Sequence, residues 1–301
     1  MAGEGKPSRL QRAAGEKVVM VTGASSGIGR AAARKLAAAG AEVLLVSRDA
    51  ARLGVVKDEI ENRGGVAHVH AADLSDMADV ERMAAEVLKQ HGHVDILVNN
   101  AGRSIRRSIS LSYNRFHDFE RTMQVNYFGA VRLILLLLPE MRRQKSGHII
   151  NISTVGVQTG PPRYAAYVAS KAALDGFSRS AAAELATDGV AITTIHMPLV
   201  RTPMIKPTRI YSALPAISAD QAAGLICKAV VTRPKRIDTP IGSAGELAYA
   251  LTPGLVDTAL GVAYRVFPES SAAQGKPGAT DADPVSRTAK AMGRLLLGVH
   301  W

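Results

Sequence analysis

Cysteine is almost absent from this sequence: Cys227 is the only one among 301 residues. A lone cysteine excludes an intrachain disulfide and any zinc cluster built from cysteines. Since structural disulfides belong to oxidising compartments, their exclusion favours a cytoplasmic protein. Nothing else in the sequence resembles a metal site, and we expect none.

Long apolar runs are absent as well. The run LILLLL at 133–138 ends at Pro139, and no stretch reaches the roughly 18 apolar residues that suggest a membrane-spanning helix. The opening residues, MAGEGKPSRLQRAAGEK, carry no apolar core of the kind found in secretory signals. We therefore expect no transmembrane segment, while peripheral contact with a membrane stays open.

Aromatic residues are scarce, at 4% of the chain, which is too few for a platform that stacks nucleic-acid bases. The formal net charge of +11 would suit nucleic acid. However, the basic residues are scattered among acidic ones, as in RFHDFERTM, and form no basic helix. We expect no nucleic-acid partner, and the charge fits an anionic cofactor or substrate, or a solvated basic surface.

Apolar β-branched runs alternate with helical patterns along residues 17–242. The expected strands are 17–23, 41–47, 66–71, 94–100, 147–153, 190–197 and 236–241, and the expected helices are 27–39, 49–63, 76–90, 116–143, 164–187 and 218–231. This alternation predicts an α/β protein with helices on both faces of a doubly wound parallel sheet. We expect a Rossmann-type sheet of about seven strands in the order 3-2-1-4-5-6-7, with ligands beyond the carboxyl ends of its strands.

The rest of the chain lies outside this α/β domain of residues 17–242. Residues 1–16 are expected to be a flexible lead. Residues 243–301 are expected to be an apolar, helical extension with a disordered stretch near 268–284. The expected helix 116–143 is apolar most of the way round, which fits a deep core or a second subunit. We expect a homo-oligomer, either a dimer or a tetramer.

A glycine-rich turn, VTGASSGIGR, joins the first strand to the first helix and is a variant of the G-x-G-x-x-G pattern. Glycine lets the backbone approach a phosphate without a Cβ clash. The helix N-terminus adds free N–H groups and the positive end of its dipole. The turn therefore predicts a nucleotide-binding site, with contacts at Gly23, Ser25, Ser26, Gly27, Ile28 and Gly29.

The end of the second strand reads VSRD and bears on the choice of cofactor. Ser47 stands where an acid would bind the ribose 2′-hydroxyl of NAD, and Arg48 follows. A basic group there suits the 2′-phosphate of NADP(H), which we predict as the cofactor. Asp49 leaves NAD open, and Arg48 at a helix entry is also an ordinary surface residue.

Tyr167 and Lys171 lie one helical turn apart in AAYVASKAALDGF. Free tyrosine has a pKa near 10, and a nearby ammonium lowers it. Such a pair suits a general acid that protonates the alkoxide formed when hydride adds to a carbonyl. The spacing alone also occurs by chance in many helices.

Together these motifs resemble the short-chain dehydrogenase/reductase superfamily over about residues 17–242. The resemblance rests on TGASSGIG, NNAG, Asn126, the hydroxyl residues after the fifth strand and YVASK. It implies Tyr167 as the general acid and Lys171 as the residue that lowers its pKa and holds the nicotinamide ribose. It further implies that Asn126 supports a proton-relay water.

The same resemblance implies further roles. Its carbonyl-positioning hydroxyl falls on Thr154 by spacing, and Ser153 lies one residue earlier, so both are kept. Pro198-Leu199 departs from the Pro-Gly that the family often carries after the sixth strand. The remaining implied cofactor contacts are Asp73, Leu74, Asn99, Ala101, Gly102, Pro198, Val200 and Thr202.

Longer stretches, such as NNAGRSIRRS and MPLVRTPMI, resemble the bacterial fatty acyl-CoA reductases within this superfamily. This similarity implies NADPH-dependent reduction of a long-chain acyl thioester, through a hemithioacetal that expels CoA thiolate, to an aldehyde. Arg103, Arg106 and Arg107 are candidate contacts for the CoA phosphates, or belong to a solvated loop. Segments 201–215 and 243–267 suit an apolar channel, a membrane contact, core packing or a subunit contact.

Two other functions stay open. A ketoreductase or alcohol dehydrogenase acting on another lipophilic carbonyl would use the same tyrosine and lysine. A non-catalytic NADP-binding sensor would keep the glycine turn and lack turnover. His196 and Trp301 are expected to be structural.

Overall fold

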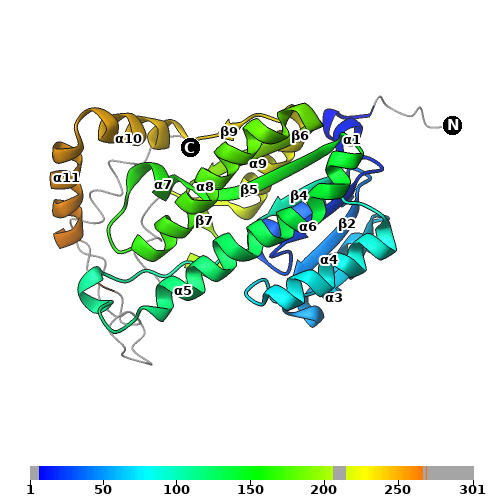
Figure 1. Ribbon diagram of the computed structural model, residues 1–301, viewed down its shortest axis with the longest axis horizontal. Helices are drawn as coiled ribbons and strands as arrows, with labels where there is room; N and C mark the ends of the chain where they lie inside the picture. The colour runs from blue at the N-terminus through cyan, green and yellow to red at the C-terminus, as the bar shows by residue number, and fades with distance from the viewer. Residues whose placement is uncertain (1–6, 206–214, 267–268, 270–301) are drawn as a thin grey trace.

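A seven-stranded parallel sheet forms the centre of the computed structural model, which describes residues 7–205, 215–266 and 269 (Figure 1). Its order is β3-β2-β1-β4-β5-β6-β9. The strands are β1 (Val18–Thr22), β2 (Glu42–Ser47), β3 (Val66–Ala71), β4 (Ile96–Asn99), β5 (Gly147–Thr154), β6 (Val190–Met197) and β9 (Arg236–Ile237). The predicted fold class and strand order are confirmed, with β9 as the seventh strand of this sheet.

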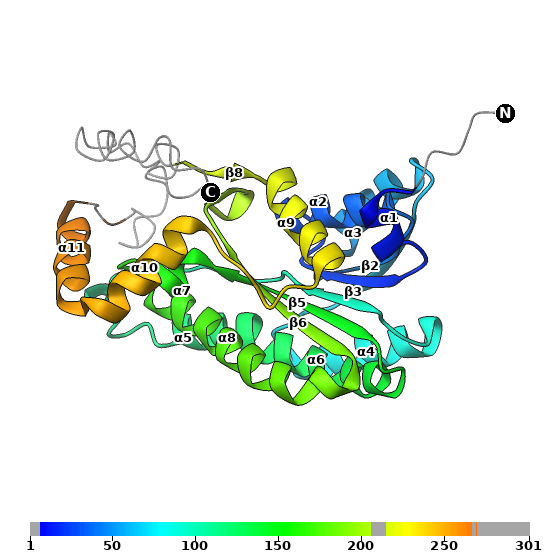
Figure 2. The same cartoon turned by 90° about the horizontal axis from the view of Figure 1, so that it is seen from above.

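Helices cover both faces of the sheet, as Figure 2 shows. One layer consists of α1 (Arg9–Ala14), α2 (Gly27–Ala37), α3 (Ala50–Glu61) and α9 (Ala219–Thr232). The other consists of α4 (Met77–His91), α5 (His117–Met123), η2 (Gln124–Gly129), α6 (Ala130–Arg143) and α8 (Ala165–Leu185). Val19 and Val21 belong to the core under the first layer, and Met20 to the core under the second. Because both faces are covered, apolar residues dominate these strands.

Several local elements differ from the expectation. Part of the expected flexible lead, 1–16, is helix α1, because Ser8 and Gln11 form a reciprocal capping box and Ala14 is buried. The expected helix 116–143 contains a π-helical turn, η2. Elements that the sequence did not predict are α7 (Val155–Thr159), a small sheet of β7 (Val200–Arg201) and β8 (Ile217–Ser218), and the short helices η1 (Ile109–Leu111) and η3 (Ala186–Asp188). The short helix η4 (Pro203–Ile205) lies in the proline-rich segment after residue 200, where a loop or short helices are expected.

In the described part of the chain, one helical run, His117–Arg143, is long and apolar enough to cross a membrane by length and composition. Its side chains Leu133, Ile134 and Leu137 are buried in the second core, which fits a core helix of this sheet. We therefore assign it to packing within the domain.

The chain then leaves the sheet in two helices, α10 (Pro240–Leu251) and α11 (Pro253–Val266), which extend to one side of the body (Figures 1 and 2). They expose large apolar side chains, among them Leu247, Leu251 and Leu255. The stretch predicted to be disordered, 268–284, and the end of the chain lie outside the described residues, except for Glu269.

Candidate active site

The glycine turn leads from β1 into α2 and leaves room for little more than backbone. Gly23 and Gly27 have φ of 67° and 54°, a region that L side chains rarely adopt. A Cβ on Gly27 would lie 3.2 Å from Thr202 Cγ2, and one on Gly29 would collide with the carbonyl oxygen of Gly23. Because these positions are glycine, no side chain of the turn at these positions screens the N-terminus of α2, which fits a bound phosphate.

Asn100, which the sequence did not single out, fastens this turn to the end of β4. Its Nδ2 donates to Thr22 O at 2.9 Å, and its backbone N–H donates to Thr22 Oγ1 at 3.0 Å. The side chain of Asn99 points the other way and donates to Asn151 Oδ1 at 2.9 Å. Successive strand residues alternate in direction, so Asn100 borders the cavity and the placement expected for Asn99 is corrected.

A cavity of about 1030 Å³ lies at the carboxyl ends of the strands. The predicted site residues that line it are Gly23, Ser25, Ser26, Gly27, Ile28, Arg48, Asp73, Leu74, Ala101, Gly102, Ser153, Thr154, Tyr167, Lys171, Pro198, Val200 and Thr202. Gly29, Asn99 and Asn126 are not among the described residues that line it. The doubly wound fold thus gathers segments far apart in the sequence at one edge of the sheet.

Two arginines reach the cavity where β2 ends. Arg48 Nη1 lies 3.7 Å from Asp73 Oδ2, and its side chain is well exposed. Arg52, one turn into α3, also lines the cavity. Asp49 caps α3 by accepting from Arg52 N at 3.0 Å, so this carboxylate is occupied by the helix. The corner thus holds two arginines and two carboxylates, and each arginine is paired with one of them, Arg48 with Asp73 and Arg52 with Asp49.

Tyr167 and Thr154 meet across the cavity from α8 and β5. The phenol is hydrogen-bonded with the Thr154 side chain. Thr154 Oγ1 also accepts from Gly156 N at 3.1 Å as the N-cap of α7. Ser153 borders the cavity too, but its Oγ is buried and has no partner among the described residues. Of the two candidate hydroxyls, Thr154 is the one engaged with the phenol.

The pKa values of Tyr167 and Lys171 differ from those expected from the sequence. Burial raises the pKa of Tyr167 to about 12, against the hydrogen bond with Thr154. Burial lowers the pKa of Lys171 to about 8, against the attraction of Asp175. The predicted lowering of the tyrosine pKa by Lys171 is not among the causes, and the ammonium donates to the Ile152 carbonyl at 2.7 Å. The phenol is therefore protonated at neutral pH, as a proton donor must be.

Asn126 lies behind the cavity in the π-helical turn η2 and is buried. Its Nδ2 donates to Arg103 O and to Ser170 Oγ, each at 2.9 Å, and its Oδ1 accepts from Arg103 N at 2.7 Å. A Cβ on Gly102 would lie 3.1 Å from Asn126 Oδ1 and 3.6 Å from Lys171 Nζ. Asn126 thus lies close to Lys171 and fixes the segment that follows β4.

The outer cavity combines an arginine-rich rim with apolar walls. Arg103, Arg106, Arg107 and Arg121 line it. Arg107 Nε donates to the buried Asp118 carboxylate at 3.0 Å, so part of this rim is tied to α5. The apolar lining residues are Ile105, Val155, Pro161, Val168, Met197, Leu199, Met204 and Ile205. The sequence predicted the three arginines after β4 and missed Arg121.

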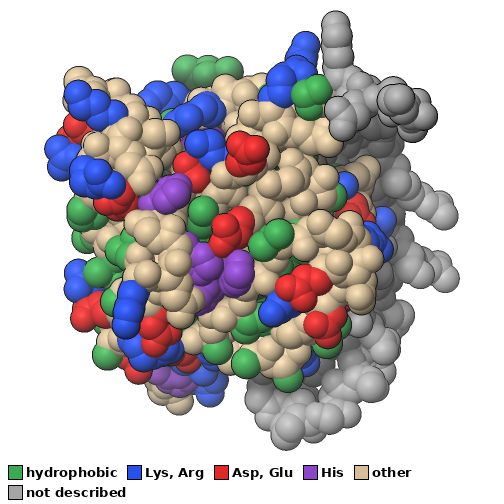
Figure 3. All heavy atoms as spheres, turned by 90° about the vertical axis from the view of Figure 1, so that its right-hand side faces the viewer, with side chains coloured by type: hydrophobic (Ala, Val, Ile, Leu, Met, Phe, Trp, Pro, Cys, Tyr) green, Lys and Arg blue, Asp and Glu red, His purple; other side chains and the backbone are tan. Residues whose placement is uncertain are grey.

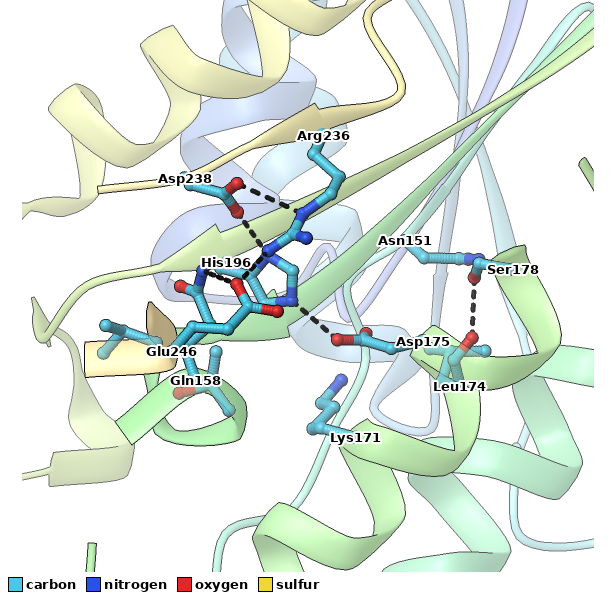
Figure 4. A network of polar contacts seen from close by, with 12 residues as sticks. Asn151, Gln158, Lys171, Leu174, Asp175, Ser178, His196, Arg236, Asp238 and Glu246 are labelled. Carbon is cyan, nitrogen blue, oxygen red and sulfur yellow. Dashed lines mark hydrogen bonds and ion pairs between the residues drawn. The ribbon is translucent and has the colours of Figure 1, made fainter. Parts of the chain in front are cut away.

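Beyond Lys171, a buried imidazole lies between two carboxylates (Figure 4). His196 Nε2 lies 2.6 Å from Asp175 Oδ2, and His196 Nδ1 lies 2.6 Å from Asp238 Oδ1. Arg236 Nε lies 3.1 Å from the second oxygen of Asp238. The network joins β6, α8 and β9, and Asp175 lies one turn beyond Lys171. His196 does not line the cavity. Burial lowers the pKa of Lys171, and Asp175, a partner of His196, acts to raise it.

Replacing His196 with glutamine should destabilise the protein by about 3 kcal/mol, because two largely buried carboxylates lose their cation. Burial lowers the pKa of His196, but Asp175 and Asp238 outweigh burial and raise it. The contribution of the imidazolium is therefore fully present below pH 6.5 and is lost as pH rises through the raised pKa. Urea unfolding of wild type and variant across this range measures the difference.

His148→Gln is the matched control, since His148 is also buried on a neighbouring strand. Burial, and next to it Arg233, lowers the pKa of His148 to about 3, so this imidazole is neutral in the fold. The wild-type advantage over His148→Gln should shrink as pH falls below 6.5, the opposite trend. Parallel pH trends for the two variants would contradict the charged state of His196.

Comparisons with known proteins agree with this geometry. Residues 17–211 match the family model of short chain dehydrogenases. A fatty acyl-CoA reductase of Acinetobacter baylyi is 50% identical over 285 residues, 95% of each chain. A fatty acyl-CoA reductase of Mycobacterium tuberculosis is 44% identical over 242 residues, 80% of this chain and 82% of the relative.

Solved structures agree as well. A metagenomic short-chain oxidoreductase in complex with NADP superposes with a TM-score of 0.66 at 33% identity, covering 75% of this chain and 98% of the other. The family match spans the glycine turn, the Tyr167–Lys171 pair and every strand of the large sheet except β9. The chain is therefore a member of the short-chain dehydrogenase family of oxidoreductases.

Proposed function

We propose that this protein is an NADPH-dependent reductase of a lipophilic carbonyl, namely long-chain fatty acyl-CoA, which it converts to fatty aldehyde. One observation carries the proposal: the glycine turn, the Tyr167–Thr154 contact and an arginine-rich rim surround a single cavity. The fatty acyl-CoA reductase of Acinetobacter baylyi, similar along nearly the whole chain, supports this substrate class.

The residues at the inner end of the cavity fit a dinucleotide. Gly23, Gly27 and the N-terminus of α2 would hold its pyrophosphate, and Arg48 with Arg52 its 2′-phosphate. The bound nicotinamide supplies the hydride. Lys171 lies deep in the cavity, where its ammonium would hold the nicotinamide ribose, and Asn126 keeps the segment beside it in place.

Thr154 and Tyr167 would both interact with the carbonyl oxygen of the substrate. Thr154 would donate a hydrogen bond to it, which orients the carbonyl and stabilises the charge that develops there. Tyr167 would then deliver its proton to that oxygen, giving a hemithioacetal. When the hemithioacetal collapses, its C–S bond breaks and CoA leaves as the thiolate. Overall, one thioester, one hydride and one proton give one aldehyde and one CoA thiol.

The outer cavity suits the two parts of an acyl-CoA. Arg103 and Arg106 lie where phosphates of CoA would meet guanidinium groups. The apolar lining suits the start of an acyl chain, and the exposed apolar side chains of α10 and α11 offer a surface for its continuation or for a membrane. Cytoplasmic location and homo-oligomerisation remain predictions of the sequence.

The test compares palmitoyl-CoA, a fatty aldehyde and a panel of ketones as oxidants of NADPH. We expect palmitoyl-CoA to consume NADPH and to yield aldehyde and free CoA thiol in equal amounts. Turnover with ketones alone would replace the proposal with a ketoreductase. Tight NADPH binding without turnover on any carbonyl would indicate a sensor.

A separate prediction concerns the preference for NADPH over NADH. Replacing Arg48 with aspartate should lower the preference for NADPH over NADH about 10- to 100-fold, because attraction to the 2′-phosphate becomes repulsion in an exposed corner. The ratio of kcat/KM for the two cofactors measures the change.

Lys57→Glu is the control, as it inverts a charge on α3, the helix that follows Arg48, outside the cavity. It should leave the cofactor ratio unchanged. An unaltered ratio in Arg48→Asp would place recognition of the 2′-phosphate elsewhere, with Arg52→Asp as the next variant.

A further inference from the structure

Histidines gather on the side of the molecule away from α10 and α11. On the face shown in Figure 3, adjoining histidine side chains lie next to an acidic one. The cluster comprises Glu42 at the start of β2, His68 and His70 on β3, and His91 at the end of α4. Half of the eight histidines in the chain lie in HVH at 68–70 and HGH at 91–93.

The fold brings these side chains together. In β3, His68 and His70 are two residues apart and share the sheet face that α4 covers. β2 and β3 pair in parallel, with Glu42 opposite Val66, so the carboxylate joins this same face. α4 ends at His91 above it. The three elements are separate in sequence, which is why no metal-binding spacing is visible in the chain.

Three of the residues converge on one point. His91 Nδ1 lies 2.7 Å and His68 Nε2 lies 3.2 Å from the same carboxylate oxygen, Glu42 Oε1. One ligand atom from each residue lies within 4.8 Å of the others. Ligands of one tetrahedral zinc ion are separated by roughly 3.3 Å, given metal–ligand bonds of about 2 Å. Only small side-chain movements separate the observed arrangement from coordination.

Hydrogen bonding alone leaves this cluster unsatisfied. His70 Nε2 is buried and has no hydrogen-bond partner among the described residues. The His70 side chain is almost fully buried, and its ring centroid lies 5.5 Å from that of His91. Buried polar atoms without partners are uncommon, and a missing ion is one established cause.

We propose that Glu42, His68 and His91 bind a divalent transition metal ion, with Zn²⁺ as the physiological candidate, and that His70 or a water completes the coordination. Two imidazoles and one carboxylate are ligands that zinc favours, while calcium and magnesium prefer oxygen alone. The ion would replace the protons now shared with Glu42 Oε1 and would join α4 to β2 and to the edge strand β3. Nothing in this assignment depends on the proposed reaction.

The position of the cluster indicates a structural role. Glu42 lies at the start of β2, whereas the cavity lies beyond Ser47 at its end, roughly 16 Å along the strand. β3 is the edge strand of the sheet. We therefore expect the ion to stabilise this edge and to leave turnover unchanged.

The experiment uses the full chain, freed of any affinity tag and stripped with a chelator, and titrates it with Zn²⁺ and Co²⁺ by calorimetry. We expect one ion per chain, visible Co²⁺ absorption typical of tetrahedral ligands, and a rise in unfolding temperature of about 5 °C at 100-fold excess over Kd. His68→Gln, at a partly exposed position that tolerates exchange, should weaken binding at least about tenfold.

His93→Gln is the matched control. It removes a histidine two residues from His91, but its Nε2 lies 3.2 Å from Asp95 and outside the cluster. Its zinc affinity should equal that of wild type. The proposal is overturned if wild type binds no stoichiometric ion, or if His68→Gln and Glu42→Gln both bind as tightly as wild type. NADPH turnover with and without zinc should agree, and a dependence on zinc would overturn the structural role.

Discussion

Replacing Tyr167 with phenylalanine should lower turnover of the carbonyl substrate about 10²- to 10⁴-fold, the usual contribution of a positioned proton donor. Phenylalanine keeps the ring and removes only the hydroxyl. That hydroxyl is the protonated group that contacts Thr154 in the cavity, and burial holds its pKa at about 12. Single-turnover oxidation of NADPH measures the loss.

Measuring NADPH binding shows whether Tyr167→Phe loses turnover through catalysis or through misfolding. Fluorescence titration should give a Kd within a few-fold of wild type, since Lys171 and the glycine turn are untouched. Tyr113→Phe, at an exposed position outside the cavity, should retain wild-type turnover. A fully active Tyr167→Phe protein would remove the phenol from the mechanism.

Much of the fold could be predicted because its strands are buried on both faces. A strand such as GHIINIS carries apolar side chains on both faces, Ile149 in one core and Ile150 in the other, and the expected 147–153 differs by one residue from β5. The sequence did not predict short helices whose first residue is set by a single capping side chain. Thr154 begins α7 by capping it directly after β5, and Ser8 with Gln11 begins α1 within an otherwise polar lead.

The cofactor end of the site was predictable for a similar reason. Parallel strands place their carboxyl ends at one edge, so residues after several strands must meet there. The direction of each side chain was harder to predict from the sequence. Because successive strand residues point in opposite directions, Asn100 rather than Asn99 lies at the cavity. Partners that meet only in space, such as His196 and Asp238, leave no spacing to recognise.

The electrostatics of the tyrosine–lysine pair also required the structure. Spacing places the two side chains on one helix face but does not say what else each one meets. Lys171 meets the carbonyl of Ile152, and its pKa falls with burial. Binding of an anionic cofactor would favour the charged form of Lys171. We therefore expect the tyrosine–lysine interaction that the sequence predicts to form in the complex with the cofactor.

Thr154→Val should lower kcat about 10²- to 10³-fold, comparable to the loss of one hydrogen-bond donor to a developing oxyanion. Valine matches threonine in shape, so the change removes the hydroxyl that contacts Tyr167 and leaves the volume of the cavity nearly constant. Steady-state kinetics with NADPH and the acyl substrate report the loss in kcat. KM should change less, because the hydrogen bond strengthens as charge develops.

Two companion variants identify the hydroxyl that acts. Thr154→Ser restores a hydroxyl at the same position, and with it the cap of α7, and should recover most of the turnover, which excludes loss of the threonine methyl group as the cause. Ser153→Ala removes a hydroxyl that is buried and unpartnered among the described residues, and should change kcat only a few-fold. If Ser153→Ala instead loses more turnover than Thr154→Val, the carbonyl is positioned by Ser153, and the contact between Thr154 and the phenol serves only to orient Tyr167.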